Sequence, residues 1–508
     1  MRLLIVGGYG TFGGRIVELL EGDERLTLIV AGRSRDRAER YCASRRGARA
    51  RLEAAEFDRN GDVAAQLARL RPDVVVDASG PFQAYGAGAY RLLEACIAAR
   101  IHYLDLADGS DFVAGVAAFD ASAKAAGVYA LSGVSSFPVL TAAVVRRLTR
   151  GWLRVGRIEG CIAPSPFAAV GANVIRAIAS YAGQRIVIGQ NASHPFTEHR
   201  RCTIAPPGGL PLRSTLFSLV DVPDLRVLTT LWPQAKVWMG AGPVPEILHR
   251  ALIACAWLVR LRLAPSLSPL APLMHWATNR LRWGEHRGGM YVSAAGLDGD
   301  GCAVTRSWHL IAEGADGPLI PSMAVQAIVL KDLEGAPPAS GARACVEDVE
   351  LDDYERLFTT RRIYTGVRDE PAPQAPLYQR LLGDAWRRLP PPVRAMHEGV
   401  ASVAGVAHVE RGRGALARIA AWMMSFPAAQ SEAAVRVTFA SDGRGETWRR
   451  SFGAQSFRSR QYAGAGRSEH LLCERFGALE FAMGLAIEEE RLHLVLRRWK
   501  AFGVPLPL

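Results

Sequence analysis

The sequence predicts an α/β protein in which residues 1–135 form a doubly wound parallel sheet. Short apolar runs alternate there with helix-like stretches, and a glycine-rich turn follows the first run directly. A strand, helix, strand pattern that repeats five times is typical of a parallel sheet with helices on both faces. The apolar runs span residues 3–8, 26–32, 50–58, 73–80, 101–108 and 127–133.

The rest of the chain predicts two further domains. Residues 136–365 mix strand-like runs with long helix candidates, which indicates an α+β substrate or dimerisation domain whose antiparallel sheet covers a cofactor. Residues 366–376 are rich in proline and are typical of a linker. Residues 377–508 carry 19 basic and 12 acidic side chains and glycine-punctuated strand-like runs. We expect a separate β-rich domain there, with one or two helices at its start.

Charge and cysteine usage narrow the function classes. The chain has a net charge of +12, but its basic residues form no single block and no nucleic-acid motif, so we expect no nucleic-acid partner. A phosphorylated cofactor fits the positive charge better. The eight cysteines show no Cys-x-x-Cys spacing, which argues against a metal site or a redox pair. The N-terminus begins directly with an apolar strand and leaves no room for a signal peptide, so we expect a cytoplasmic protein.

The glycine-rich turn, GGYGTFGGRI, follows the first strand and opens a helix. Its G-x-G-x-x-G spacing is typical of a Rossmann dinucleotide-binding domain. Gly8 would allow the tight turn out of the strand, Gly10 the approach of a pyrophosphate, and Gly13 close packing of the helix. The alternative is a glycine-rich turn in another α/β fold. The expected cofactor contacts in this turn are Gly8, Tyr9, Gly10, Thr11, Phe12 and Gly13.

The end of the second strand indicates NADP(H) rather than NAD(H). NAD-binding proteins place a carboxylate at this position to hold the ribose hydroxyls. Here the strand ends in Gly32-Arg33-Ser34, so Arg33 can pair with a 2′-phosphate and Ser34 can donate a hydroxyl. The alternative is a solvated arginine-rich loop. Asp58 ends the third strand, where it would either reach the adenine or cap the next helix.

Two further strand ends carry candidate site residues, because ligands of such sheets bind at the carboxyl ends of the strands. The fourth strand ends in Ser79, Gly80, Pro81 and Phe82, which we expect beside the cofactor. The fifth strand carries Tyr103, Asp105 and Asp108, which are candidates for acid–base work. Tyr103 and Asp105 are the proposed catalytic pair, and helix capping is the alternative for Asp108.

Together these motifs resemble the saccharopine dehydrogenase family, and in particular its NADP-binding domain. The matching segments are GGYGTFGG, AGRS, DASGPFQAYG and HYLDLAD, and the helix-like residues 317–335 followed by GARAC resemble the family's closing helix. The resemblance covers about residues 1–350 and implies an NADP-dependent oxidoreductase. Many members carry a glutamate shortly after Asp105, and its absence here argues against amino-acid chemistry. Some relatives are enoyl reductases that act on lipid chains.

The C-terminal part resembles the domain of unknown function 4166. The resemblance rests on Gly443-x-Gly445-Glu446-Thr447-Trp448, on RRSFG and ERFG, and on the ending RRWK. It implies no known chemistry. Side chains that could line a pocket for an anionic or lipid-like ligand are Glu446, Trp448, Arg450 and Arg498. The alternative, a plain β-fold with buried tryptophans and surface arginines, is preferred.

Residues 244–283 are the most apolar part of the chain. Prolines interrupt the stretch and its longest uncharged run is too short to span a bilayer, so we expect no transmembrane helix. Packing in the core or in a homodimer interface is the preferred interpretation. A peripheral helix at the inner membrane face, flanked by arginines, and an apolar substrate tunnel are the alternatives.

Two functional hypotheses follow. The first is an NADP-dependent oxidoreductase that transfers a hydride to a small, hydrophobic enoyl or ketone substrate, with the protein supplying orientation and a dry site. The second is a non-catalytic NADP(H)-binding sensor or partner-binding protein. Turnover of NADPH would separate the two.

Overall fold

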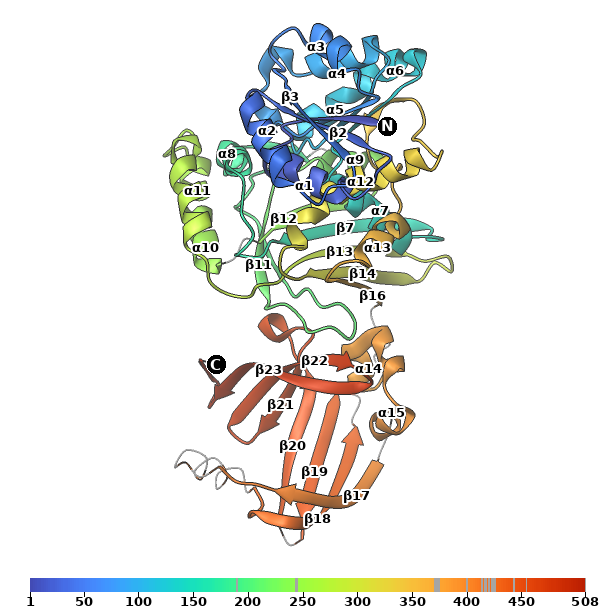
Figure 1. Cartoon of the computed structure of the whole chain (residues 1–508). Coiled ribbons are helices and arrows are strands. Elements are labelled where there is room, and N and C mark those ends of the chain that lie inside the picture. Colours follow the sequence, from blue (N-terminus) through green and yellow to red (C-terminus); the bar gives the residue numbers. More distant parts are fainter. Residues whose placement is uncertain are drawn as a thin grey trace. The chain divides into compact units, whose positions relative to one another are not determined.

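The computed structural model of the chain is shown in Figure 1. It divides into two compact units. The first comprises residues 1–200, 216–305 and 312–363, and the second comprises residues 201–215, 306–311 and 364–508. The described residues are 1–188, 191–242, 245–369, 375–398, 401–412, 414, 418, 421, 426–441, 444–453 and 455–507.

The first unit contains a seven-stranded parallel sheet in the order β15-β6-β5-β4-β1-β2-β3. The order reverses between β1 and β4, which is the topological switch point where α/β sheets bind ligands. The predicted Rossmann arrangement is therefore confirmed. The strands are β1 (Arg2–Val6), β2 (Thr27–Gly32), β3 (Arg51–Glu56), β4 (Val74–Asp77), β5 (His102–Asp105), β6 (Tyr129–Ser132) and β15 (Gly341–Ala344).

Helices cover both faces of this sheet because successive strand residues alternate between two buried layers. Leu4 and Val6 of β1 belong to the core that α3 and α4 close, whereas α1 and α2 lie together on the other side (Figure 1). Gln66 of α3 also ties the end of β3, since its amide accepts from Asp58 N at 2.8 Å. The helices are α1 (Thr11–Leu20), α2 (Arg35–Ser44), α3 (Val63–Leu70), α4 (Arg91–Ala98), α5 (Ser110–Gly115) and α6 (Asp120–Ala126).

The seventh strand comes from far along the sequence. The helix expected within residues 317–335 is present as α12 (Ile320–Leu333), and it packs on α1, where Gln326 Nε2 donates to Leu19 O at 2.9 Å. The chain then returns as β15, which pairs in parallel with β6. We did not predict this strand, because its four residues are too few to show a hydrophobic pattern.

A second sheet follows the Rossmann strands. In the first unit it runs β11-β12-β7-β13, and β12 and β7 are parallel neighbours. The expectation of an antiparallel sheet was therefore wrong, and the sheet is mixed. Its strands are β7 (Arg154–Ala163), β11 (Thr215–Leu219), β12 (Lys236–Ala241) and β13 (Gly288–Leu297). The helices of this part are α7 (Thr141–Leu148), α8 (Ala172–Tyr181), α9 (Asp224–Leu231), α10 (Glu246–Arg260), α11 (Ala271–Arg280) and α13 (Leu351–Phe358).

The C-terminal residues form the expected β-rich part with two helices at its start. Helices α14 (Leu377–Leu382) and α15 (Pro391–His397) precede an eight-stranded antiparallel sheet in simple chain order. Its strands are β17 (Ala401–Val409), β18 (Gln430–Ser441), β19 (Gly445–Phe452), β20 (Gln455–Ala463), β21 (Leu472–Phe476), β22 (Leu479–Glu488), β23 (Arg491–Ala501) and β24 (Val504–Leu506).

Of the segment predicted as a linker, residues 366–369 continue strand β16 (Ile363–Asp369) and residues 370–374 lie outside the described part of the chain. Among the described residues, no helix is both long and apolar enough to cross a bilayer.

Candidate nucleotide site at the carboxyl edge of the parallel sheet

The glycine-rich turn lies at the carboxyl end of β1, beside the switch point. Gly7 is the residue with the left-handed conformation, at φ +82°, and not Gly8, to which we assigned the tight turn. The turn is anchored to β2, because the Gly7 and Gly8 amides both donate to Ala31 O, at 2.8 and 2.9 Å. A methyl group on Gly8 would lie 2.9 Å from Ile5 O, so close approach fixes this residue.

Helix α1 packs against this turn more closely than any side chain would allow. A Cβ atom on Gly13 would lie 2.2 Å from Gly7 O and 2.7 Å from Gly8 Cα. One on Gly10 would lie 3.0 Å from Gly7 O. No side chain caps the first turn of α1, so its N–H groups and the positive end of the helix dipole face outward. The turn is a cradle of backbone donors that suits a phosphate group.

Arg33 follows β2 at the same edge. It is exposed and has no hydrogen-bond or ion-pair partner among the described residues. Ser34 is the N-cap of α2 and accepts from Arg37 N at 3.4 Å. The Tyr9 hydroxyl accepts from Ser34 N at 3.1 Å, and the Arg37 guanidinium lies over the Tyr9 ring. Tyr9 therefore ties the glycine turn to the loop that presents Arg33.

Asp58 lies at the end of β3 and does not cap the next helix. Its Oδ1 accepts from Asn60 N at 3.0 Å, within a tight turn. The N-cap of α3 is Asp62, which accepts from Ala65 N. The helix-capping alternative for Asp58 was therefore wrong, and its half-buried carboxylate remains at the sheet edge.

The end of β4 is held by a buried polar cluster. Asp77 is inaccessible to solvent, and its Oδ1 accepts from Ser79 N at 3.0 Å and from Ser79 Oγ at 2.5 Å. Ser79 Oγ also lies 2.9 Å from the Tyr85 hydroxyl, and the Arg59 guanidinium stacks 3.3 Å from the Tyr85 ring centroid. Burial raises the pKa of Asp77, and the nearby Arg59 opposes that rise. This cluster fixes the loop that carries Gly80.

The residues that follow Ser79 lie partly in the hydrophobic core and partly at the carboxyl edge of the parallel sheet. Phe82 is 6% exposed and packs on Tyr85 and Phe112, so its ring belongs to the core. Pro81 is half-buried. Gly80 O accepts from Asn173 Nδ2 of α8 at 2.8 Å. Residues before α8 also approach the glycine turn, because a Cβ on Gly171 would lie 3.2 Å from Thr11 Oγ1.

The two side chains that we expected to be catalytic are enclosed. Asp105 is fully buried, and its Oδ1 accepts from Ala107 N, Gly133 N and Ser132 Oγ, each at 2.9 Å. Tyr103 is 1% exposed within the hydrophobic core, and burial raises its pKa. Burial also raises the pKa of Asp105, to about 7. Asp105 fastens the end of β5 to the end of β6, which is a structural role.

A second group of acids lies at the same edge and remains partly accessible. Asp108 Oδ1 accepts from Gln83 Nε2 at 3.0 Å, and Asp221, which follows β11, accepts from Ser110 Oγ at 2.8 Å. Burial raises the pKa of Asp108, and the nearby Asp221 carboxylate adds to that rise, whereas the hydrogen bond from Gln83 opposes it. Burial, helped by both carboxylates, raises the pKa of Tyr181 at the end of α8.

Sequence reasoning missed Asp221 and Tyr181. They come from the mixed-sheet part of the chain, and no motif links them to the strand ends of the parallel sheet.

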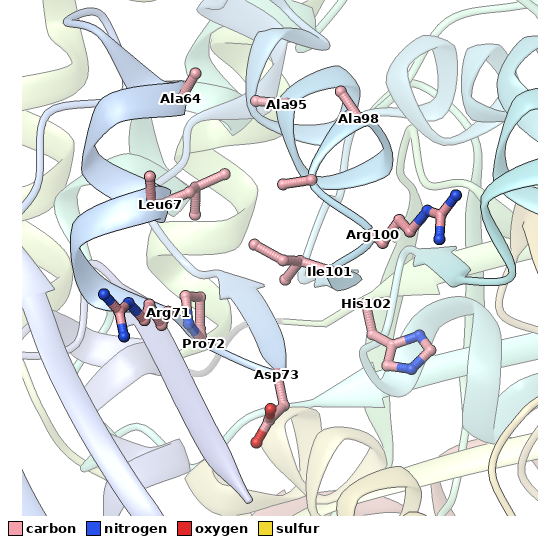
Figure 2. Close-up of a pocket in the computed structure, with 12 residues that line it drawn as sticks. Ala64, Leu67, Arg71, Pro72, Asp73, Ala95, Ala98, Arg100, Ile101 and His102 are labelled. Carbon is pink, nitrogen blue, oxygen red and sulfur yellow. The ribbon is translucent and has the colours of Figure 1, made fainter.

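A hollow of about 730 Å³ lies at the opposite edge of the sheet. Figure 2 shows its lining, with Ala64 and Leu67 on α3 facing Ala95 and Ala98 on α4, and with His102 at the start of β5. The amino ends of parallel strands are not the ligand-binding edge of this fold. The candidate site is therefore the carboxyl edge.

Three of the four proposed pocket residues of the C-terminal part, Glu446, Trp448 and Arg450, contact one another. Glu446 is 2% exposed, and its Oε2 accepts from Trp448 Nε1 at 3.0 Å and lies 3.1 Å from His397 Nδ1. Arg450 donates to Ser459 Oγ at 2.8 Å and stacks over Trp448. Arg498, on β23, is half-buried. Gly443 lies outside the described residues.

Comparisons with known proteins agree with both resemblances. Residues 3–131 match the family described as the saccharopine dehydrogenase NADP binding domain, and residues 389–508 match a domain of unknown function, DUF4166. Both resemblances are thereby confirmed. No curated protein matches the chain.

Two solved structures match the chain at low sequence identity. Apo saccharopine dehydrogenase (L-Glu forming) from Saccharomyces cerevisiae matches with a TM-score of 0.52 at 12% identity, over 72% of this chain and 99% of that one. A probable dehydrogenase from Thermotoga maritima matches over 72% of this chain and 98% of that one at 11% identity, with a TM-score of 0.34. The first match shows a common fold.

The contact between Gly13 and Gly7 predicts that Gly13→Ala destabilises the protein. The added methyl group has no room, so the start of α1 must move, and we expect a loss of about 1–3 kcal/mol, seen as a lower urea midpoint. Gly22→Ala is the matched control, because a Cβ there meets nothing within 4 Å. Equal midpoints for both variants and the parent would contradict this close packing.

The burial of Asp105 predicts a pH-dependent stability. The folded state binds the Asp105 proton up to about pH 7, whereas the unfolded chain releases it near pH 4. The unfolding free energy therefore falls as pH rises between these values, and Asp105→Asn should reduce the slope by up to about 1.4 kcal/mol per pH unit. Urea unfolding from pH 5 to 7 measures this slope. The exposed Asp300→Asn should leave it unchanged, and an unchanged slope in Asp105→Asn would refute the assignment.

Proposed function

We propose, from the match of residues 3–131 to the saccharopine dehydrogenase NADP binding domain, that this protein is an NADP(H)-dependent oxidoreductase. One observation carries the proposal. A cradle that only glycines can form lies at the switch point, next to a strand end with a free arginine and no carboxylate. These are the features expected of a site for a dinucleotide with a 2′-phosphate.

The residues at this edge fit such a cofactor. The N–H groups of Thr11, Phe12 and Gly13 at the start of α1 would hold the pyrophosphate, beside Gly8, Tyr9 and Gly10. Arg33 would pair with the 2′-phosphate, since a guanidinium matches phosphate oxygens with two parallel hydrogen bonds. The Ser34 hydroxyl is half-buried near this position. Further residues available at the same edge are Asp58, after β3, and Ser79, Gly80 and Pro81, after β4. Phe82 would support the loop after β4 from the hydrophobic core, where its ring packs on Tyr85.

Bound NADPH would supply a hydride to the substrate. The chain must then provide a proton at a group that substrate can reach. Asp108 meets this requirement better than the enclosed Asp105 and Tyr103, because it is partly accessible at the same sheet edge and burial raises its pKa. Gln83, which donates to Asp108, and Asp221, which accepts from Ser110, would hold the loop after β5 that carries Asp108. Asp105 would position the same loop by joining the ends of β5 and β6.

The predicted substrate is a small ketone or enoyl compound. Its apolar character and the formation of a homodimer stay predictions, which a substrate panel and the mass of the protein in solution would test. NADPH binding without turnover of any panel compound would instead support the non-catalytic sensor.

Arg33→Glu should select against NADPH. The variant loses the charge-assisted hydrogen bonds to the 2′-phosphate and places a negative charge beside it, so NADPH binding should weaken by about 10- to 100-fold. The affinity for NADH, which lacks this phosphate, should stay the same or rise. Calorimetric titration with both nucleotides measures this. Arg46→Glu, a change of another exposed arginine, should alter neither affinity. Equal losses for NADPH and NADH would mean that Arg33 does not read the phosphate.

Asp108→Asn should separate chemistry from cofactor binding. Loss of the proton donor should lower kcat by about 10²- to 10⁴-fold on any ketone or enone that is turned over, with the NADPH Kd unchanged. The parent's rate should fall as pH rises through the raised pKa of Asp108, because only the protonated acid donates. Asp111→Asn, at a highly exposed carboxylate, is the control. Full activity in Asp108→Asn would remove Asp108 from the reaction.

A further inference from the structure

Helices α10 and α11, with the segments between and directly after them, carry an unusual concentration of exposed apolar side chains. Of the 21 large hydrophobic residues that are exposed among the described residues, ten lie within residues 247–283. We call these ten residues the hairpin face. They are Ile247, Trp257, Leu258, Leu261, Leu263, Leu270, Leu273, Trp276, Leu281 and Trp283.

Only one side of the helical hairpin is used for packing. Ala256, Val259 and Ala271 lie in a hydrophobic cluster with Ile175 and Ala179 of α8. Figure 1 shows α10 and α11 beside α8, along one side of the first unit. The expectation that residues 244–283 pack in the core therefore holds for one side of the hairpin alone.

The outward side has helical spacing. Ile247 and Leu258 of α10 lie 11 residues apart, which places them on one stripe that Leu261 continues just after the helix, and Leu273 and Trp276 lie three residues apart on α11. Leu273 is 59% exposed and Trp276 57%. Exposed apolar side chains that gather in this way on a folded protein mark an interaction surface.

The charges around the hairpin face are positive. Residues 246–287 contain Arg250, Arg260, Arg262, Arg280, Arg282 and Arg287. The same residues contain two acids, and each is paired: Glu246 with Arg250, at 2.7 Å, and Glu285 with Arg287. Arg262 and Arg280 have no hydrogen-bond or ion-pair partner among the described residues.

We propose that the hairpin face docks on the surface of an anionic lipid bilayer, with its leucines and tryptophans in the interface and its arginines among the headgroups. A helix that lies in the interface has an apolar side rich in leucine and tryptophan and a basic border. Tryptophan suits this depth because its ring is apolar and its N–H group is polar. The 15 residues of α10 are too few to span the bilayer.

The positive charge around the hairpin face argues against a second copy of the chain as its binding partner. In a two-fold dimer the same patch meets itself, so the arginines of one hairpin would approach those of the other without a free carboxylate to pair with them. An anionic surface instead complements every one of these charges. The inference is independent of the proposed enzymatic function, because it uses no residue of the nucleotide site.

Flotation with lipid vesicles tests the proposal on the full chain. The protein should float with vesicles of phosphatidylcholine and phosphatidylglycerol, bind neutral phosphatidylcholine vesicles at least tenfold more weakly, and be released by salt. Arg262→Gln with Arg280→Gln should weaken binding to anionic vesicles about tenfold, whereas Arg46→Gln should not.

A second pair of variants tests the apolar contribution. Leu273→Glu with Trp276→Glu should abolish flotation, whereas Leu153→Glu with Val187→Glu, at equally exposed positions elsewhere in the first unit, should leave it intact. Two outcomes overturn the proposal. One is a parent protein that stays unbound on anionic vesicles. The other is a dimer that Leu273→Glu with Trp276→Glu splits into monomers, which would assign the hairpin face to a second copy.

Discussion

The close contact between the end of β1 and the start of α1 is the constraint on which the candidate site depends. Gly7 turns the chain back in a left-handed conformation, and the Gly10 amide donates to Gly7 O at 2.8 Å. Gly13 then rests against that same carbonyl, at a distance that excludes a side chain. This packing aims the uncapped end of α1 along the sheet edge and makes the edge suitable for an anion.

The aspartates at the ends of β4 and β5 differ in solvent exposure, and we therefore assign them different roles. Asp77 and Asp105 are inaccessible, and Oδ1 of each accepts from hydroxyl and backbone donors that fix the loops after β4 and β5. Asp108, three residues beyond Asp105, is partly accessible. A buried acid that is held by several donors is a structural anchor, whereas an accessible acid with a raised pKa can exchange a proton with a ligand.

Local sequence patterns predicted the Rossmann strands and the glycine cradle, because alternating apolar runs and glycine spacing are short-range signals. They failed where tertiary contacts decide. Strand β15 joins the sheet from residues 341–344, and Asp221 reaches the site edge from the mixed sheet. Tyr103 was expected at the carboxyl end of the fifth strand, but it is the second residue of β5 and is buried in the hydrophobic core. For residues 244–283, apolar composition could not show which side of the helices faces outward.

Hydrogen–deuterium exchange of the full chain with and without NADPH is the sharpest test for a nucleotide site at the carboxyl edge of the parallel sheet, because it locates the nucleotide without assuming a substrate. We expect protection of the glycine turn at residues 7–14, of the loop that carries Arg33, and of the loops after β4 and β5. Protection confined to the eight-stranded sheet of the C-terminal part, or no protection at saturating NADPH, would contradict it.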